Sequence, residues 1–136
     1  MIIYKETDRF KKDFKHLLKK FKTLDGDFEI VKKATIEVFH INNINNNSIF
    51  LIEGQQNESL KDKIEIYKIK KIACRSLKGF GCNSGLRIIY AYFKEENVVE
   101  FLQCYHKNET KNEDKTMIKE YLNKMGLNKK INNFIK

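Results

Sequence analysis

The sequence lacks several features that would place it in a large class of proteins. No apolar run approaches the ~18 residues that a membrane-spanning helix needs. The first ten residues do not show the basic-then-apolar order of a signal peptide. Hydrophobic residues make up 41% of the chain, which excludes a disordered protein. We therefore expect a soluble, cytoplasmic protein with no membrane partner.

Proline is absent, whereas asparagine, isoleucine and lysine are abundant. This composition indicates biased codon usage, so the positions of the lysines are more informative than their number. The formal net charge is +9, from 27 Lys and Arg against 18 Asp and Glu. Such an excess favours polyanionic partners. It does not distinguish DNA, RNA, a membrane surface and an acidic protein.

Cysteine is scarce as well. Cys74, Cys82 and Cys104 cannot all pair within one chain, and without a secretion signal we expect them to be reduced thiols. With His106 they are conceivable zinc ligands, but no two of them have the Cys-x-x-Cys spacing. The simpler interpretation makes Cys74 and Cys104 small strand residues. We expect no metal and no other cofactor.

Two N-terminal segments have the periodicity of amphipathic helices. Apolar side chains recur every third or fourth position in residues 7–22 and again in residues 28–40. Thr7 is suited to cap the first helix, and so is the aspartate that follows it. Gly26 is expected to end this helix, and Asp27 to cap the second. The two helices should form a hairpin that packs on one face of a sheet.

The middle of the chain is rich in β-branched and aromatic residues, which favour strands. Predicted strands cover residues 49–54, 63–74, 86–93 and 98–105, with loops at 41–48 and 55–62. A short strand at 2–4 precedes the helices, and a helix ending at Gly126 follows the sheet, with a short helix after it. Short joints favour antiparallel pairing. The prediction is a single α+β domain, residues 1–136, in two layers. In it, an N-terminal helical hairpin and a C-terminal helix pack on a mainly antiparallel sheet of about four strands.

Cations occupy unusual places in the predicted sheet. Lys68 and Lys70 alternate onto one face of a strand, where they repel each other unless an anion lies between them. A solvated strand face explains them equally well. Arg87 stands in an apolar strand, so it needs a partner. That partner is either a carboxylate, Glu100 or Glu53, or a phosphate, which suits the planar guanidinium.

Further polar residues gather beside these strands. Arg75 and Lys78 lie in the preceding loop, and the last strand ends with Tyr105, His106 and Lys107. A histidine beside a tyrosine and a lysine is a credible proton carrier near pH 7. We expect the heads of Lys68, Lys70, Arg87 and His106 to converge on a space that fits one phosphate.

Three segments, "IYKIKK", "SGLRIIYAYF" and "FLQCYHKNE…DKTMIKEYL", resemble the core of the RelE/ParE superfamily of toxin–antitoxin toxins. The likeness covers roughly residues 6–123. It implies a metal-independent endoribonuclease that cuts mRNA, commonly on the ribosome, by attack of the 2′-hydroxyl on the adjacent phosphate. It also implies a cognate antitoxin protein as partner.

The resemblance assigns roles to individual residues. Lys68 and Lys70 match the catalytic lysines, one of which helps to deprotonate the 2′-hydroxyl, and Arg87 matches the arginine that contacts the scissile phosphate. His106 or Tyr105 would supply the proton donor. We expect substrate binding by a further group of residues, which comprises Arg75, Lys78, Tyr105 and Lys107.

The chain also departs from the family pattern. Asn108 and Asp114 stand where RelE has an arginine and a tyrosine, and the loop at 75–84 is longer. The alternatives are therefore a ParE-like toxin that inhibits gyrase without nuclease activity, or a degenerate member that only binds its antitoxin or nucleic acid. A nucleic-acid-binding domain unrelated to toxins is a third possibility.

Overall fold

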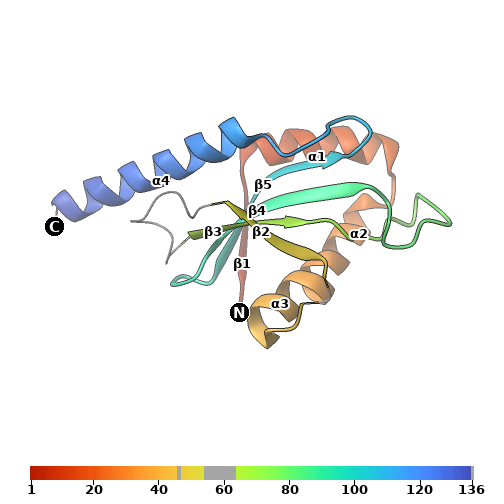
Figure 1. The fold of residues 1–136 in the computed structure, drawn as a ribbon, viewed down its shortest axis with the longest axis horizontal. Coiled ribbons are helices and arrows are strands. Elements are labelled where there is room, and N and C mark those ends of the chain that lie inside the picture. Colours follow the sequence, from red (N-terminus) through yellow and green to blue (C-terminus); the bar gives the residue numbers. More distant parts are fainter. Residues whose placement is uncertain (46, 54–63, 136) are drawn as a thin grey trace.

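The computed structural model describes residues 1–45, 47–53 and 64–135, without the side chains of residue 53 and residues 127–135. Helices and strands in this part of the chain are arranged as an α+β fold (Figure 1). The strands are β1 (Ile3–Glu6), β2 (Ile49–Glu53), β3 (Ile64–Ile69), β4 (Leu86–Phe93) and β5 (Val98–His106). The helices are α1 (Asp8–Lys20), α2 (Leu24–Val31), the π-helical turn η1 (Lys32–Ile36), α3 (Glu37–Asn42) and α4 (Lys115–Ile135).

The described strands form a five-stranded sheet in the order β1-β5-β4-β3-β2. The four strands from β2 to β5 pair antiparallel in chain order, as short connections require. The α+β class is therefore confirmed, but the sheet has five strands rather than four. The fifth is β1, which pairs parallel with β5 and brings Ile3 opposite Val98.

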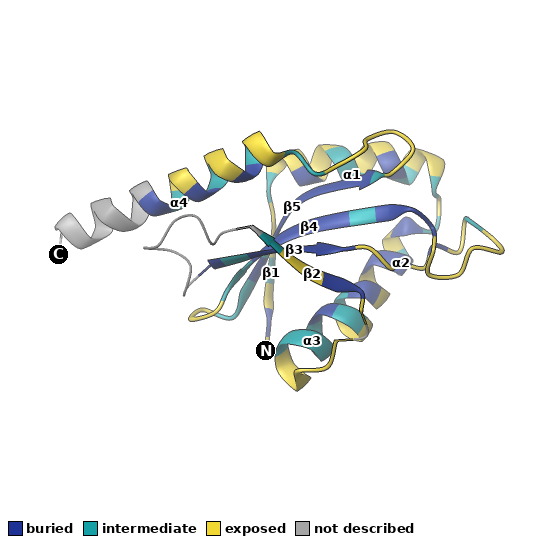
Figure 2. Ribbon diagram, in the orientation of Figure 1, coloured by how far each residue is buried: buried dark blue, intermediate teal, exposed yellow. Residues whose placement is uncertain are grey.

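The helices cover both faces of the sheet. One apolar cluster joins α1, α2 and η1 to strand residues that include Ile69, Tyr90 and Phe101. A second cluster joins Ile118 and Leu122 of α4 to strand residues of the opposite parity, such as Ile66. Because successive strand residues point to opposite faces, α4 forms a third layer instead of sharing the hairpin's face. Figure 2 shows the buried strands between these helices.

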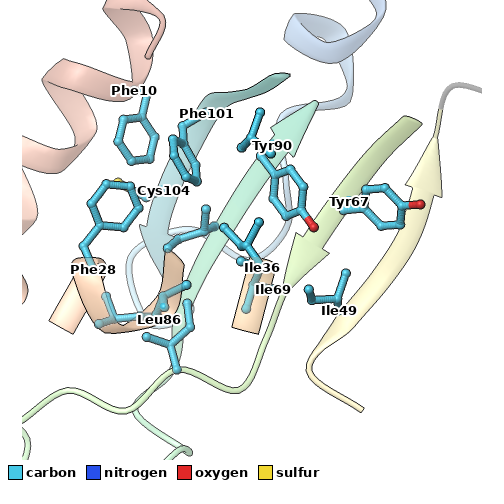
Figure 3. Packing of buried hydrophobic residues seen from close by; sticks show 14 of the residues in the cluster. Phe10, Phe28, Ile36, Ile49, Tyr67, Ile69, Leu86, Tyr90, Phe101 and Cys104 are labelled. Atoms are coloured by element: carbon cyan, nitrogen blue, oxygen red, sulfur yellow. The ribbon is translucent and has the colours of Figure 1, made fainter. Parts of the chain in front are cut away.

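The first cluster is built around aromatic rings (Figure 3). The ring centroids of Phe10 and Phe28 lie 5.2 and 4.7 Å from that of Phe101. Phe10 is buried, as is Leu17, in agreement with the predicted stripe. Phe14 is packed against the cluster but is only partly buried. Val38, an apolar residue of the helix predicted for residues 28–40, is likewise only partly buried.

Two glycines that were expected to end helices lie inside helices instead. Thr7 caps α1 as predicted, because its hydroxyl accepts the Phe10 amide. However, α2 begins at Leu24, so Gly26 is helical. The guanidinium of Arg75 lies against Gly26, where a Cβ atom would collide with it. Gly126 lies within the 21-residue α4, which tolerates the modest cost of one glycine.

The strand predicted for residues 63–74 is shorter than expected. It ends at Ile69, after which the Lys70 amide bonds to the Ser48 carbonyl and Ile72 forms an isolated bridge with Asn83. The loop predicted for residues 55–62 lies outside the described residues. The hairpin turn at residues 94–97 joins β4 and β5 as predicted, with Asn97 in the left-handed region.

Candidate functional site

Three of the candidate residues lie on the sheet face that α4 covers, which we call the α4 face. Arg87 of β4 pairs directly with Tyr105 of β5. Lys68 of β3 pairs with Ile89, two residues beyond Arg87 on the same face. The Cα atoms of residues in such diagonal positions are roughly 7–8 Å apart. The register therefore makes Lys68, Arg87 and Tyr105 neighbours, as the strand pattern predicted for the two cations.

Lys68 is neutralised by a carboxylate. Its Nζ atom donates to Oε1 of Glu113 at 2.7 Å, and the exposed fractions of the two side chains are only 10% and 11%. Burial alone would lower the pKa of the Lys68 ammonium, but its interactions with Glu113 and Tyr105 together outweigh burial and raise the pKa. Burial would raise the pKa of Glu113, but the bond from Lys68, together with a backbone hydrogen bond and the charges of Lys68 and Lys115, holds it below its usual value. Lys68 is thus charged here, contrary to the lowered pKa expected of a general base.

Arg87 is held by backbone carbonyls. Its Nη1 atom donates to the carbonyls of Lys70 and Leu86 at 3.0 and 3.1 Å. None of the carboxylates whose side chains the structure describes forms a salt bridge with it. Glu100, one of the two expected partners, accepts a hydrogen bond from Tyr121 instead. The side chain of the other, Glu53, lies outside the described residues. The half-buried guanidinium therefore keeps donors for another acceptor.

Lys70 and Tyr105 complete the α4 face. Lys70 is exposed, and its Nζ atom lies 5.1 Å from the ring centroid of Phe50, the residue that pairs with Lys68. Tyr105 is buried, and its hydroxyl has no hydrogen-bond partner among the described residues. The Lys68 ammonium lies 6.0 Å from the Tyr105 ring centroid. A buried hydroxyl without a partner is costly. The Tyr105 hydroxyl is therefore available to donate a hydrogen bond to a ligand beside Lys68 and Arg87.

His106 lies on the opposite face, so the predicted convergence of four side-chain heads is wrong for this residue. Its ring stacks on Phe21 at the end of α1, with 5.5 Å between centroids. The Asn108 amide donates to Nδ1 at 3.1 Å, and Nε2 lies 2.9 Å from the Ser84 carbonyl. Nδ1 is therefore an acceptor and Nε2 carries the proton, which assigns the neutral tautomer. The physical reason is strand alternation, because neighbouring residues such as Tyr105 and His106 face opposite ways.

The remaining candidate residues are dispersed. Arg75 donates through Nε to Oδ1 of buried Asp27 at 2.8 Å, which ties the loop to α2. Lys78 is exposed in the loop that follows, and Lys107 is exposed just beyond β5. The structure does not bring these cations to Lys68. Asp114, which the resemblance aligns with a tyrosine of RelE, accepts the Met117 amide and so caps α4.

Other expectations about the chain concern metals and membranes. Among the described residues, no group of three or more His, Cys, Asp or Glu is arranged to hold a metal ion. The three cysteines are unpaired, with Cys74 and Cys104 buried and Cys82 exposed. Within the same residues, every helix is too short or too polar to cross a lipid bilayer.

Sequence reasoning missed Glu113, which is the residue that occupies the candidate site. It stands in a polar segment that the sequence marks only as a loop, 45 positions from Lys68. Gln103 was also missed. Its side chain is buried and accepts the Asp114 amide at 3.0 Å. It thereby fixes the segment that carries Glu113 onto β5.

The sequence matches no family model and no curated protein. Among solved structures it is similar to the solution structure of the conserved hypothetical protein HP0892 from Helicobacter pylori. The match has a TM-score of 0.45 and 20% sequence identity, and it covers 80% of this chain and 98% of that chain. Any function therefore has to be argued from the residues of the α4 face.

Proposed function

We propose that the chain is the toxin of a toxin–antitoxin pair, a RelE-like endoribonuclease that cleaves mRNA at the α4 face. One observation carries the proposal. A carboxylate oxygen already sits 2.7 Å from Lys68, diagonally next to a half-buried Arg87 that no described carboxylate neutralises. A place that holds one anionic oxygen between strand cations suits a phosphate oxygen equally.

The residues of this face divide the work of RNA cleavage. The 2′-oxygen attacks the adjacent phosphorus, a cyclic phosphate forms, and the bond to the 5′-oxygen breaks. Arg87 binds the phosphate oxygens, on which negative charge increases during the attack, and this kind of electrostatic stabilisation is often the largest contribution. Lys68 takes the proton of the 2′-hydroxyl. Tyr105, rather than His106, gives a proton to the 5′-oxygen.

In the described structure, Glu113 closes the candidate site to substrate. While its carboxylate binds Lys68, a phosphate has no access to the ammonium. Removing Glu113 takes away the largest of the interactions that raise the pKa of Lys68, so this pKa falls, while the interaction with Tyr105 stays. Opening would thus both admit the substrate and prepare Lys68 as a base. The moving part is the segment that carries Glu113, together with the start of α4.

The proposed partners are a cognate antitoxin and mRNA, the latter on the ribosome. An antitoxin segment that covers the α4 face meets a net charge of +9 and should be acidic or amphipathic. Its affinity should fall as salt rises. A complex that ignores salt and leaves Lys70 and Arg87 uncovered would contradict this part of the proposal.

The decisive experiment is induction of the chain in a bacterial host, followed by primer extension on abundant mRNAs. New 5′ ends that appear with wild type and disappear with Arg87→Ala support cleavage at this site. Growth arrest without new 5′ ends, accompanied by DNA damage, identifies a gyrase-type toxin instead. Neither effect would leave a nucleic-acid-binding domain unrelated to toxins.

A further inference from the structure

A groove lies on the other side of the sheet from Lys68. It has a volume of about 550 Å³ and lies at the ends of β4 and β5, between the end of α1 and the loop of residues 77–84. Its apolar lining comes from Phe21, Leu77 and Phe80. Its polar lining includes His106 and Lys107. The volume falls in the range of small-molecule and nucleotide sites.

Phe80 is displayed to solvent at this groove. Its exposed fraction is 59%, and it stands between Gly79 and Gly81, which have φ values of 86° and 56°. Both values lie in the left-handed region that glycine tolerates best. The two glycines therefore allow the tight turn at the tip of this loop, and the turn exposes the Phe80 ring to solvent. Nearby, the stacked rings of Phe21 and His106 form a second flat surface.

The charge around the groove favours an anion. Glu109 is the acidic member of the lining, and its carboxylate lies 2.9 Å from both Lys20 and His16. Hydrogen bonds from these two side chains hold the pKa of Glu109 below its usual value. Lys107 is exposed at the rim and has no ion pair among the described residues. The charge of Glu109 is thus neutralised by Lys20 and His16, and the charge of Lys107 is available to a ligand.

We propose that this groove binds an unpaired nucleotide of RNA, with its base stacked on Phe80 and a phosphate against Lys107. Aromatic platforms beside cations are how proteins hold single strands without reading their sequence. The inference rests on the proposed function and extends it. Leu86 pairs with His106, and the next residue is Arg87, so the groove and the α4 face meet at the same end of the sheet. A strand whose phosphate contacts Arg87 can place a flanking base in the groove.

The test uses the purified full chain and a fluorescein-labelled seven-nucleotide RNA of mixed sequence with 2′-O-methyl groups, which removes the attacking hydroxyl. Fluorescence anisotropy gives the affinity. Phe80→Ala should weaken binding at least about fivefold, the lower end of what one stacked base contributes. Phe80→Tyr keeps the ring and should restore binding. Lys107→Ala should reduce the slope of log K against log salt by about 0.7.

Ile41→Ala is the matched control, since Ile41 is an exposed apolar residue in α3 with an exposed fraction of 51%. It should leave RNA affinity unchanged, and the Phe80 and Lys107 variants should keep the unfolding midpoint of wild type. If Arg87→Ala weakens binding and Phe80→Ala does not, the groove serves another partner, such as a protein, and this inference fails while the proposed function stands. If wild type binds no RNA at all, both fail.

Discussion

Lys68 and Glu113 form an ion pair that connects the centre of the sheet to the segment before α4, with 2.7 Å between Nζ and Oε1. In Glu113→Gln the ammonium keeps a neutral acceptor but loses its counter-charge. We expect RNA cleavage to rise. The part of the pH–rate profile in which the rate increases as Lys68 loses its proton should move to lower pH, because the bond that raises the pKa of Lys68 is weakened. The pH–rate profile on a synthetic RNA measures this.

The same variant should also lower the free energy of unfolding, by about 1–3 kcal/mol, since a buried charge loses its partner. Glu29→Gln is the matched control. It removes a carboxylate from a surface pair with Lys32, in which the Glu29 side chain is 62% exposed, and should change neither quantity measurably. Reduced cleavage in Glu113→Gln with an unchanged pH–rate profile would show that Glu113 does not block the site.

Arg87→Ala should abolish most toxicity and RNA cleavage while the protein stays folded. Arg87 has only carbonyl partners in the described structure, so its loss should cost about 1 kcal/mol of stability or less. Arg87→Lys should not restore activity, because the lysine lacks the planar fork that binds two phosphate oxygens. Growth after induction tests the loss of toxicity, and thermal unfolding tests whether the protein stays folded. An Arg87→Ala protein that kills as wild type does would refute the phosphate role.

His106→Ala should reduce cleavage less than about tenfold. Both ring nitrogens are occupied by backbone groups on the face away from Lys68, so the side chain holds the end of β5 and does not transfer a proton. Tyr105→Phe, which removes the partnerless hydroxyl, should lower cleavage by ~10²–10⁴ if it is the general acid. Single-turnover rates on the same RNA compare the two. The reverse order of effects would return the proton-donor role to His106.

Stability should fall between pH 6.5 and pH 4 because of His40. Burial lowers the pKa of His40 from 6.5 to about 4, and the ring bonds to the Tyr90 hydroxyl at 2.8 Å. The unfolded chain therefore binds a proton that the folded chain does not, so stability is lost as pH falls through this range. Partial exposure of the ring limits the effect to about 1–2 kcal/mol. Urea unfolding at pH 7.5 and 5.0 should show it, and His40→Gln should reduce the difference.

Phe10→Ala should destabilise the fold more than Phe14→Ala. Phe10 is fully buried against Phe28 and Phe101, so truncation should cost about 3–5 kcal/mol. Phe14 is partly exposed and its neighbours can relax, which places its cost below that range. Denaturant unfolding of the two variants gives the comparison. Equal losses would show that Phe14 is enclosed more tightly than its exposure indicates.

Periodicity identified most helices and strands but not their arrangement. The stripe of α1 was readable because Phe10 and Leu17 recur at helical spacing. The stripe of α4 was equally readable, yet a stripe does not say which face of a sheet it will cover. The parallel pairing of β1 with β5 was not predicted, because its partner lies near the other end of the chain.

The candidate site shows a similar division. Strand alternation placed Lys68 on one face, and the same rule, applied to Tyr105 and His106, places these two neighbours on opposite faces. The role of Glu113 had no such signal. A loop carboxylate can reach many lysines, and only the tertiary path of the segment held by Gln103 selects Lys68.

The pairing of β1 with β5 has a consequence for the order of synthesis. At 5–20 residues per second, β1 waits about 5–20 s on the ribosome before its partner strand has been made. Through that interval Phe10 and Phe28 have no Phe101 to pack on. The sheet is therefore completed only after β5 has been made, and the α4 face only after α4 has followed it. A nascent chain that has not yet reached α4 lacks both, so the proposed toxicity requires synthesis to have passed Lys115.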